Sequence, residues 1–199
     1  KLISRAILFG NPDRASVKLS PDGKRISYLA PDDGYMNVFV APVDHLEDAE
    51  AVTHDRVRGI RMYMWSHDNQ HLLYMQDDGG DENWNVFVVD LDTSESRNLT
   101  PFEEIAAHIS GSSVDHPGDM LLSINNRDPQ LHDLYRAEVA SGELTLVEEN
   151  TEGFAGYVTD SALTARVAMR MDEEGGEEVF RKDGNVWTKI FYVPAEDGL

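Results

Sequence analysis

Ser-Pro-Asp-Gly-Lys-Arg-Ile-Ser-Tyr-Leu-Ala, at residues 20–30, is the stretch that decides the fold. Its first four residues predict a turn, because proline presets φ and glycine permits a positive φ, and a strand-like run follows. The pattern recurs 46 residues later as Ser-His-Asp-Asn-Gln-His-Leu-Leu-Tyr-Met, at residues 66–75. A third copy occupies residues 116–124, with His-Pro-Gly-Asp as its turn, and a weaker fourth strand lies at 165–169. The chain is therefore a repeat protein.

A second strand repeats with more regular spacing. Asn-Val-Phe-Val at residues 37–40 recurs at 85–88, and a further shift of 48 residues leads to Asp-Leu-Tyr-Arg at 133–136. Each unit also has an apolar stretch before its turn and a short strand after its second repeat. These lie at 15–19, 60–65 and 107–110, and at 51–53, 98–100 and 146–147.

Four short strands per repeat are typical of a β-propeller blade. A blade packs both faces against neighbours, so its inner strands are apolar on both sides and it cannot bury them alone. We predict an all-β fold, a β-propeller of about four blades with four antiparallel strands each. A lead-in segment (1–13) precedes a partial propeller (14–199) whose blades cover about 14–54, 58–101, 105–149 and 153–193.

The propeller is expected to be incomplete. The last seven residues end in a turn-like segment, and nothing near them resembles a strand that would complete the first blade. We therefore expect a truncated piece of a larger protein. An open arc exposes apolar blade faces, which predicts self-association through those faces.

Composition narrows the classes of function. The chain has 17 Lys and Arg against 37 Asp and Glu, a net charge of −20, which disfavours nucleic acid and anionic membranes as partners. The absence of cysteine excludes thiol catalysis, disulfides and Cys-ligated zinc. The seven histidines show no zinc-binding spacing, so we predict no metal site and no cofactor. The compartment is left open, with the cytoplasm favoured and the periplasm expected if a signal lies upstream.

Three longer stretches carry a family resemblance. They are Leu-Phe-Gly-Asn-Pro at residues 8–12, Gly-Asp-Glu-Asn-Trp at 80–84, and the segment 126–136 with Asn-Arg-Asp-Pro at its start. Together with the repeat, they resemble the N-terminal propeller of prolyl oligopeptidase-family serine peptidases, with the acylaminoacyl-peptidase and dipeptidyl-aminopeptidase branch most similar. The resemblance covers essentially the whole chain. The short repeat alone is shared with TolB-like propellers.

The resemblance implies a role without catalysis. In such enzymes the propeller sits over an α/β-hydrolase domain that carries a Ser-Asp-His triad, with serine in a G-x-S-x-G elbow. The present sequence has no G-x-S-x-G, so no catalytic residue is assigned to it. Our first hypothesis is a propeller that gates peptide access to a missing C-terminal α/β-hydrolase domain and positions peptide substrates for it. The alternative is a stand-alone TolB-like propeller that binds a protein partner.

The candidate binding loop is acidic. Residues 77–82 place four carboxylates beside two glycines, which fits a hard-cation site, recognition of a substrate amine or of the hydrolase domain, or a solvated turn. Trp84 either stacks on a ligand or packs between blades, and Arg127 either contacts substrate or pairs with Asp128 to fix a loop. Glutamates on both sides of Gly175-Gly176 either bind an amino terminus or form a solvated hairpin tip. The substrate-binding or interface candidates are Asp81, Glu82, Asn83, Trp84 and Arg127.

Overall fold

The computed structural model describes residues 3–10 and 12–198. Lys1, Leu2, Leu199 and Asn11, the last of which belongs to the motif at 8–12, lie outside the described residues. Four sheets of four antiparallel strands follow one another along the chain, and in each sheet the spatial order is the sequence order. This confirms the predicted all-β, four-strand repeat.

We call the sheets blades 1 to 4. Blade 1 contains β1 (Ala15–Leu19), β2 (Arg25–Asp32), β3 (Tyr35–Pro42) and β4 (Glu50–Ala51). Blade 2 contains β5 (Tyr63–Trp65), β6 (His71–Gln76), β7 (Asn85–Asp90) and β8 (Ser96–Asn98). Blade 3 contains β9 (Ala107–Ser113), β10 (His116–Asp128), β11 (Leu131–Glu138) and β12 (Leu144–Glu148). Blade 4 contains β13 (Gly156–Thr159), β14 (Ala165–Met171), β15 (Glu177–Asp183) and β16 (Val186–Val193).

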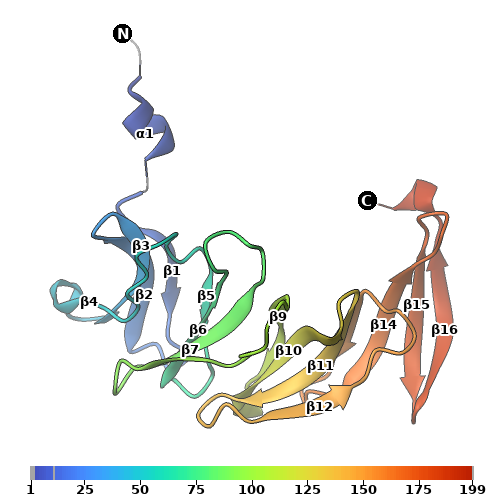
Figure 1. The fold of residues 1–199 in the computed structure, drawn as a ribbon. Coiled ribbons are helices and arrows are strands. Elements are labelled where there is room, and N and C mark those ends of the chain that lie inside the picture. Colours follow the sequence, from blue (N-terminus) through green and yellow to red (C-terminus); the bar gives the residue numbers. More distant parts are fainter. Residues whose placement is uncertain (1–2, 11, 199) are drawn as a thin grey trace.

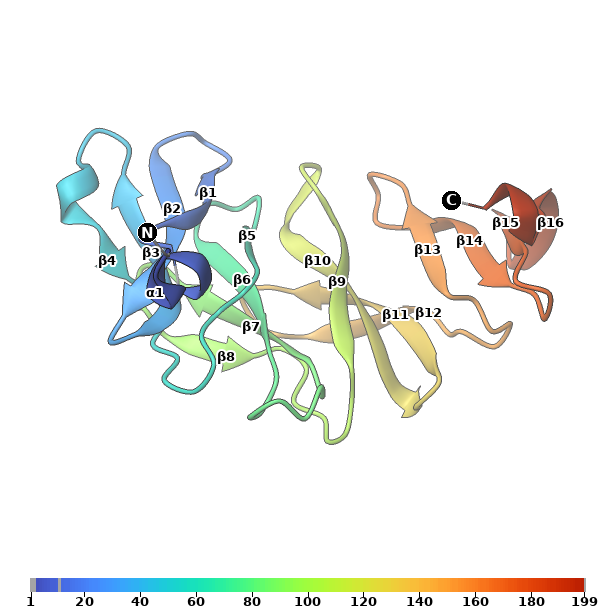
Figure 2. The same ribbon diagram turned by 90° about the horizontal axis from the view of Figure 1, so that it is seen from above.

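The blades fan out as an open arc, which confirms the prediction of an incomplete propeller. Figure 2 shows the first strands, β1, β5, β9 and β13, bordering the hollow, and the last strands on the outer rim. Blades 1 and 4 are the first and the last blade of the arc. Both described ends of the chain lie at the upper end in Figure 1, where the loops between second and third strands also lie. We call this the upper end of the arc.

The core consists of the seams between blades. Leu121 and Leu122 are adjacent on β10 and fully buried, yet Leu122 belongs to the cluster shared with blade 2 and Leu121 to the cluster shared with blade 4. A strand buried on both faces is what the uninterrupted apolar run predicted. Each fully buried leucine contributes about 1.5–3 kcal/mol relative to exposure, so stacking is the main source of stability.

The repeated residue at the start of the third strand has a structural role in each of the first three blades. In blade 1, Asn37 Oδ1 accepts hydrogen bonds from the Thr53 hydroxyl (3.0 Å) and the Asp55 N–H (2.8 Å). Asn85 accepts from the Thr100 hydroxyl (3.1 Å) in blade 2. Asp133 occupies this position in blade 3. The residue that recurs every 48 positions therefore forms hydrogen bonds that hold the linker leading to the next blade.

Some elements differ from the sequence expectation. His116–Asp119 was expected to be a turn, but it lies within β10, and the turn is formed by Val114 and Asp115. Pairing of β10 with β9 is irregular between His116 and Met120, and such a bulge accommodates Pro117 within a strand. The short helices α1 (Arg5–Phe9), η1 (Leu46–Asp48) and η2 (Ala195–Asp197) were not predicted.

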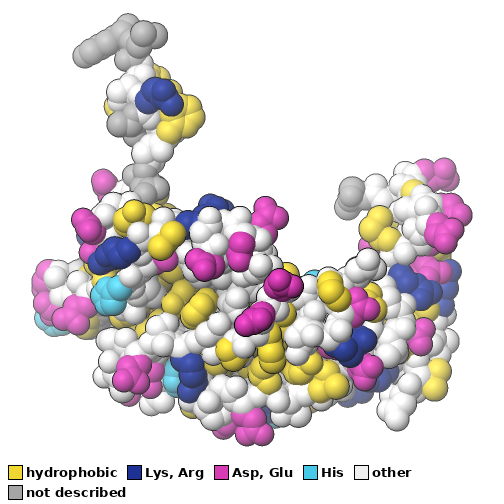
Figure 3. All heavy atoms as spheres, viewed as in Figure 1, with side chains coloured by type: hydrophobic (Ala, Val, Ile, Leu, Met, Phe, Trp, Pro, Cys, Tyr) yellow, Lys and Arg dark blue, Asp and Glu magenta, His cyan; other side chains and the backbone are white. Residues whose placement is uncertain are grey.

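Acidic side chains are spread over all four blades in the view of Figure 3, while hydrophobic side chains gather along the middle of the arc. Among the described residues, no helix has the length and apolar character needed to cross a membrane.

Candidate functional site

The loop that joins β6 to β7 carries four of the five candidate residues at the upper end of blade 2. Asp81 organises it: its Oδ1 accepts the N–H of Asn83 (3.0 Å) and of Asp78 (3.2 Å), and its Oδ2 accepts the Asn83 side-chain amide (3.0 Å). The hydrogen bond from the Asn83 N–H, assisted by that of its side chain, holds the pKa of Asp81 below its ordinary value. Asp81 is therefore an anion committed to shaping the loop.

Glu82 and Trp84 complete this loop differently. Glu82 is exposed, and its φ of 63° places it in the left-handed region that non-glycine residues seldom occupy. Trp84 is half-buried, and its carbonyl accepts the N–H of Ala107 (2.7 Å), at the start of the first strand of blade 3. The backbone of the loop is thus tied to the next blade, while the Glu82 carboxylate faces solvent.

The base of the loop rests on an ion pair. Asp77 is buried, and its Oδ2 lies 2.5 Å from the Arg58 guanidinium. Gly80 packs on the same guanidinium: a Cβ there would lie 2.8 Å from Arg58 Nη1, and its φ of 99° also favours glycine. Two of the loop's acidic residues therefore have internal partners. Among the described residues, no group of three or more His, Cys, Asp or Glu side chains is arranged to hold a metal ion.

Arg127 belongs to a separate cluster in blade 3. Its Nε and Nη2 donate to the two oxygens of Asp133, each at 2.8 Å, and Nη2 also donates to the Asn150 carbonyl (2.9 Å). It pairs with Asp133 rather than with the neighbouring Asp128 that the sequence suggested. Burial tends to raise the pKa of Asp133, but hydrogen bonds from Arg127 and the Asn150 N–H outweigh it and hold the pKa below its ordinary value.

This cluster fixes the linker between blades 3 and 4. Asn150 is fully buried, and its side chain exchanges hydrogen bonds with the Phe154 backbone at 2.7 and 2.9 Å. Arg127 therefore positions a linker, and it lies in a different blade from Asp81 and Trp84. The glutamates near Gly175-Gly176 are also divided, because Glu178 is bound by Arg170 and Lys189 while Glu173 and Glu174 are exposed at a turn.

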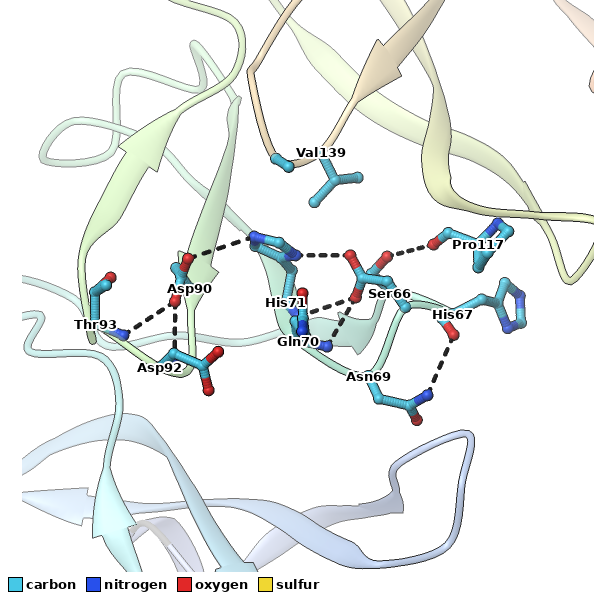
Figure 4. Close-up of polar contacts among 12 residues, drawn as sticks. Ser66, His67, Asn69, Gln70, His71, Asp90, Asp92, Thr93, Pro117 and Val139 are labelled. Carbon is cyan, nitrogen blue, oxygen red and sulfur yellow. Dashed lines mark hydrogen bonds and ion pairs between the residues drawn. The ribbon is translucent and has the colours of Figure 1, made fainter.

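A polar cluster that sequence reasoning missed lies in blade 2, at the end of the blade away from the β6–β7 loop (Figure 4). His71 is buried; its Nδ1 lies 2.7 Å from Asp68 Oδ2, and its Nε2 lies 3.7 Å from Asp90 Oδ2. Asp90 Oδ1 in turn accepts the N–H groups of Asp92 and Thr93. The cluster thus joins two turns of blade 2 and borders a cavity of about 260 Å³. Its only sequence signal was that His71 occupies the repeat position of Arg25.

At this end of blade 2, polar contacts also cross the seam between blades 2 and 3. Figure 4 shows the Ser66 hydroxyl directed at the Pro117 carbonyl, to which it donates at 2.8 Å. The partners of the His71 ring are two carboxylates, Asp68 and Asp90, and both belong to turns of blade 2. We assign this cluster to turn geometry.

Two curated proteins match the chain over nearly all of its length. Dipeptidyl aminopeptidase BIII of Pseudoxanthomonas mexicana is 46% identical over 200 residues, covering 100% of this chain and 29% of the relative. Dipeptidyl peptidase family member 6 of Caenorhabditis elegans is 28% identical over 213 residues, covering 98% of this chain and 28% of the relative. The chain therefore spans less than a third of either relative. No family model matches it.

Solved structures share the fold. The β-propeller domain of the trilobed protease of Pyrococcus furiosus has a TM-score of 0.57 and 17% identity, covering 89% of this chain and 56% of that one. The acylaminoacyl peptidase of Pyrococcus horikoshii also has a TM-score of 0.57, with 18% identity, and the match covers 90% of this chain and 32% of that one.

The blades and their open arrangement define the chain as an incomplete β-propeller without a catalytic elbow. The match to a dipeptidyl aminopeptidase across the full chain confirms the resemblance found in the sequence. Over its whole length the chain is similar to the corresponding part of a dipeptidyl aminopeptidase, and it shares its fold with propeller domains of peptidases.

Proposed function

We propose that this arc is the part of a serine peptidase that controls how peptides reach an α/β-hydrolase domain and helps to position them there. The observation that carries the proposal is the 46% identity to a dipeptidyl aminopeptidase across the whole chain, within less than a third of that enzyme's length. Catalysis then belongs to the remainder of such a protein. The arc supplies a wall along which a peptide passes.

The upper loop of blade 2 is the proposed contact region. Glu82 is one of three exposed carboxylates of this loop, with Asp78 and Asp81, and it stands on a loop braced by Asp81, Asn83 and the Trp84 carbonyl. A carboxylate on a braced loop suits either the free amino group of a peptide or a basic group on the hydrolase domain, because the backbone that carries it is ordered before binding. Arg127 would affect the positioning of peptides indirectly, because it holds the linker that places blade 4.

The proposal predicts that the isolated 199-residue chain does not hydrolyse dipeptidyl chromogenic substrates. Turnover abolished by a serine-directed inhibitor would place a catalytic serine in this chain and contradict the proposal. Reading the gene beyond Leu199 is the direct companion test. A stop codon with no G-x-S-x-G domain would favour the stand-alone propeller, to which the fold alone also corresponds.

In the longer protein, Glu82→Gln tests positioning. Losing a charge-assisted contact to a peptide amine lowers kcat/KM by about 10-fold, whereas N-acylated peptides are unaffected. Glu47→Gln is the matched control, because Glu47 is an exposed glutamate in η1, which lies outside the upper loops. Equal kcat/KM for Glu82→Gln and Glu47→Gln would remove Glu82 from the substrate path.

A further inference from the structure

The strands that border the hollow carry a different charge from the rest of the chain. Across β1, β5, β9 and β13 there is no Asp or Glu, although the chain has 37 such residues. Lys18 on β1 is the one Lys or Arg on these four strands; Arg61 precedes β5 by two residues, as the exposed Asp13 precedes β1. At blades 1 and 2 these strands bring two cations, Lys18 and Arg61, to the wall of one pocket that has no Asp or Glu in its lining.

These two cations lack carboxylate partners. Most basic side chains of the described residues form ion pairs, but no Asp or Glu pairs with Lys18 or with Arg61. The Lys18 ammonium lies 5.6 Å from the centre of the Tyr63 ring, a cation–π arrangement that leaves its donors available. The charges of Lys18 and Arg61 are therefore not neutralised by a carboxylate of the described residues and are available to an anionic ligand.

A β-bulge aims Lys18 toward blade 2. The register of β1 against β2 shifts between Ala15 and Lys18, and Ser16 has a φ of 52°, in the left-handed region. Blade 2 holds the strained Ser16 in place, because the Tyr63 hydroxyl donates a hydrogen bond to the Ser16 carbonyl (2.7 Å). Bulges of this kind re-aim side chains, and strain is retained where surrounding contacts enforce it.

Between the two blades lies a pocket of about 250 Å³, lined by Ser16, Val17, Lys18, Arg61, Met62 and Tyr63. Val17 and Met62 are exposed at 59% and 62%, so the pocket combines apolar walls with two cations. Met62 and Tyr63 also line a second pocket of about 180 Å³, whose other walls are apolar residues of β5, β6 and β9. Flexible methionine side chains adapt to apolar ligands of various shapes.

We propose that Lys18 and Arg61 form an anchor for a peptide carboxylate, with apolar side chains of the same peptide entering the two adjoining pockets. The guanidinium matches a carboxylate in a bidentate fashion, and Lys18 adds a second charge. A polyphosphate or nucleic acid is disfavoured because the whole chain carries −20. The inference rests on the proposed function only for the idea that peptides reach the hollow.

The test measures binding without catalysis, so it can fail independently of the proposed function. An N-terminally labelled hexapeptide of Gly, Ala, Leu and Phe is titrated with the 199-residue chain by fluorescence anisotropy at low salt. Three forms are compared: free C-terminal carboxylate, C-terminal amide, and an amide containing one Glu. We expect the free acid to bind at least 10-fold more tightly than the amide, and affinity to fall with added salt. Tight binding of the Glu-containing amide would identify a side-chain carboxylate as the natural source.

Arg61→Gln and Lys18→Gln are each expected to weaken binding of the acid by about 5- to 10-fold while leaving the amide unchanged. The matched control is Lys24→Gln, a lysine that pairs with Asp22 on a turn outside the pocket. Unchanged circular dichroism shows that the variants remain folded. Equal affinity for acid and amide, or equal losses in Lys24→Gln and Arg61→Gln, overturns the proposal.

Discussion

The seam between blades 2 and 3 and the seam between blades 3 and 4 join similar sheets by different means. The first contains eleven buried hydrophobic residues in one cluster, contributed by both blades and the linker. The second has only four in its main cluster, Leu121, Leu134, Leu163 and Ala165. A seam with less apolar area requires other interactions.

Polar contacts supply them at the second seam. Glu148 of blade 3 forms an ion pair with Lys182 of blade 4 and accepts a hydrogen bond from the Trp187 indole (3.0 Å). Lys182 also lies over the Trp187 ring, with 5.4 Å from its Nζ to the ring centre. The lesson is that equivalent blades need not have equivalent seams: one is held by burial and the other by specific pairs.

The largest expected effect comes from adjacent leucines that face different seams. Leu122→Ala and Leu121→Ala each leave a cavity at a fully buried site. We expect them to lower the free energy of unfolding by about 4 and about 3 kcal/mol, respectively, because Leu122 belongs to the larger apolar cluster and its loss removes more contacts. Urea unfolding followed by tryptophan fluorescence measures both. Leu46→Ala, at an exposed leucine, is the control and should change stability little. A larger loss in Leu121→Ala would reverse the proposed ranking of the seams.

Glu148→Gln tests the polar seam next. The side chains of Glu148 and Lys182 are only 12% and 18% exposed, so the lost charge is poorly replaced by water. The expected cost is about 2 kcal/mol, accompanied by a smaller dependence of stability on salt than in the original chain. Glu47→Gln at an exposed site is the comparison. If both substitutions leave the unfolding midpoint unchanged, apolar burial alone holds the seam.

Asp133→Asn places in blade 3 the amide that blades 1 and 2 have at this position. The charge-assisted bonds from Arg127 are lost, at a cost of about 1.5 kcal/mol at pH 7. Because the folded pKa of Asp133 lies below the ordinary 3.8, the carboxylate stabilises the fold above about pH 3.8. That contribution is lost as the pH falls through the lower folded value.

Unfolding free energies from pH 7 to pH 2.5 check this directly. The difference between the original chain and Asp133→Asn should be constant down to about pH 4 and shrink below it, with the sign set by the lowered pKa. A difference that instead grew on acidification would show that the neutral form of Asp133 is the one the fold prefers.

The sequence predicted the fold because the same physical requirement recurs four times. The turn at residues 20–23 and the strand that contains Asn37 recur in later blades, and this repetition makes the pattern visible in the sequence. The turn of blade 3 was misplaced because Pro117 sits in a bulge, which depends on pairing with β9 rather than on local preference. α1 was missed because five residues carry little periodic signal.

The candidate loop could be located from its motif, but its internal partners could not. Asp77 pairs with Arg58, which is 19 residues away in the sequence. Arg127 pairs with Asp133 and not with its neighbour Asp128, because of the direction of the two strands that carry Arg127 and Asp133. The cations at the hollow were harder still. Lys18 and Arg61 lie in different blades, and only the bulge at Ser16 and the contact from Tyr63 bring them to one pocket.

The smallest effect concerns Tyr157 on β13, at the seam of blades 3 and 4. Its hydroxyl is buried and has no hydrogen-bond partner among the described residues, and burial together with Glu148 and Asp133 raises its pKa. Removing an unsatisfied polar group costs nothing, so Tyr157→Phe should leave stability unchanged or raise it by up to about 1 kcal/mol. Tyr135→Phe is the matched control, since the Tyr135 hydroxyl donates to Asn126 at 3.1 Å and its loss should destabilise slightly. A loss in Tyr157→Phe greater than that in Tyr135→Phe would mean that the buried hydroxyl is bound, and that this seam contains one more polar contact than its side chains supply.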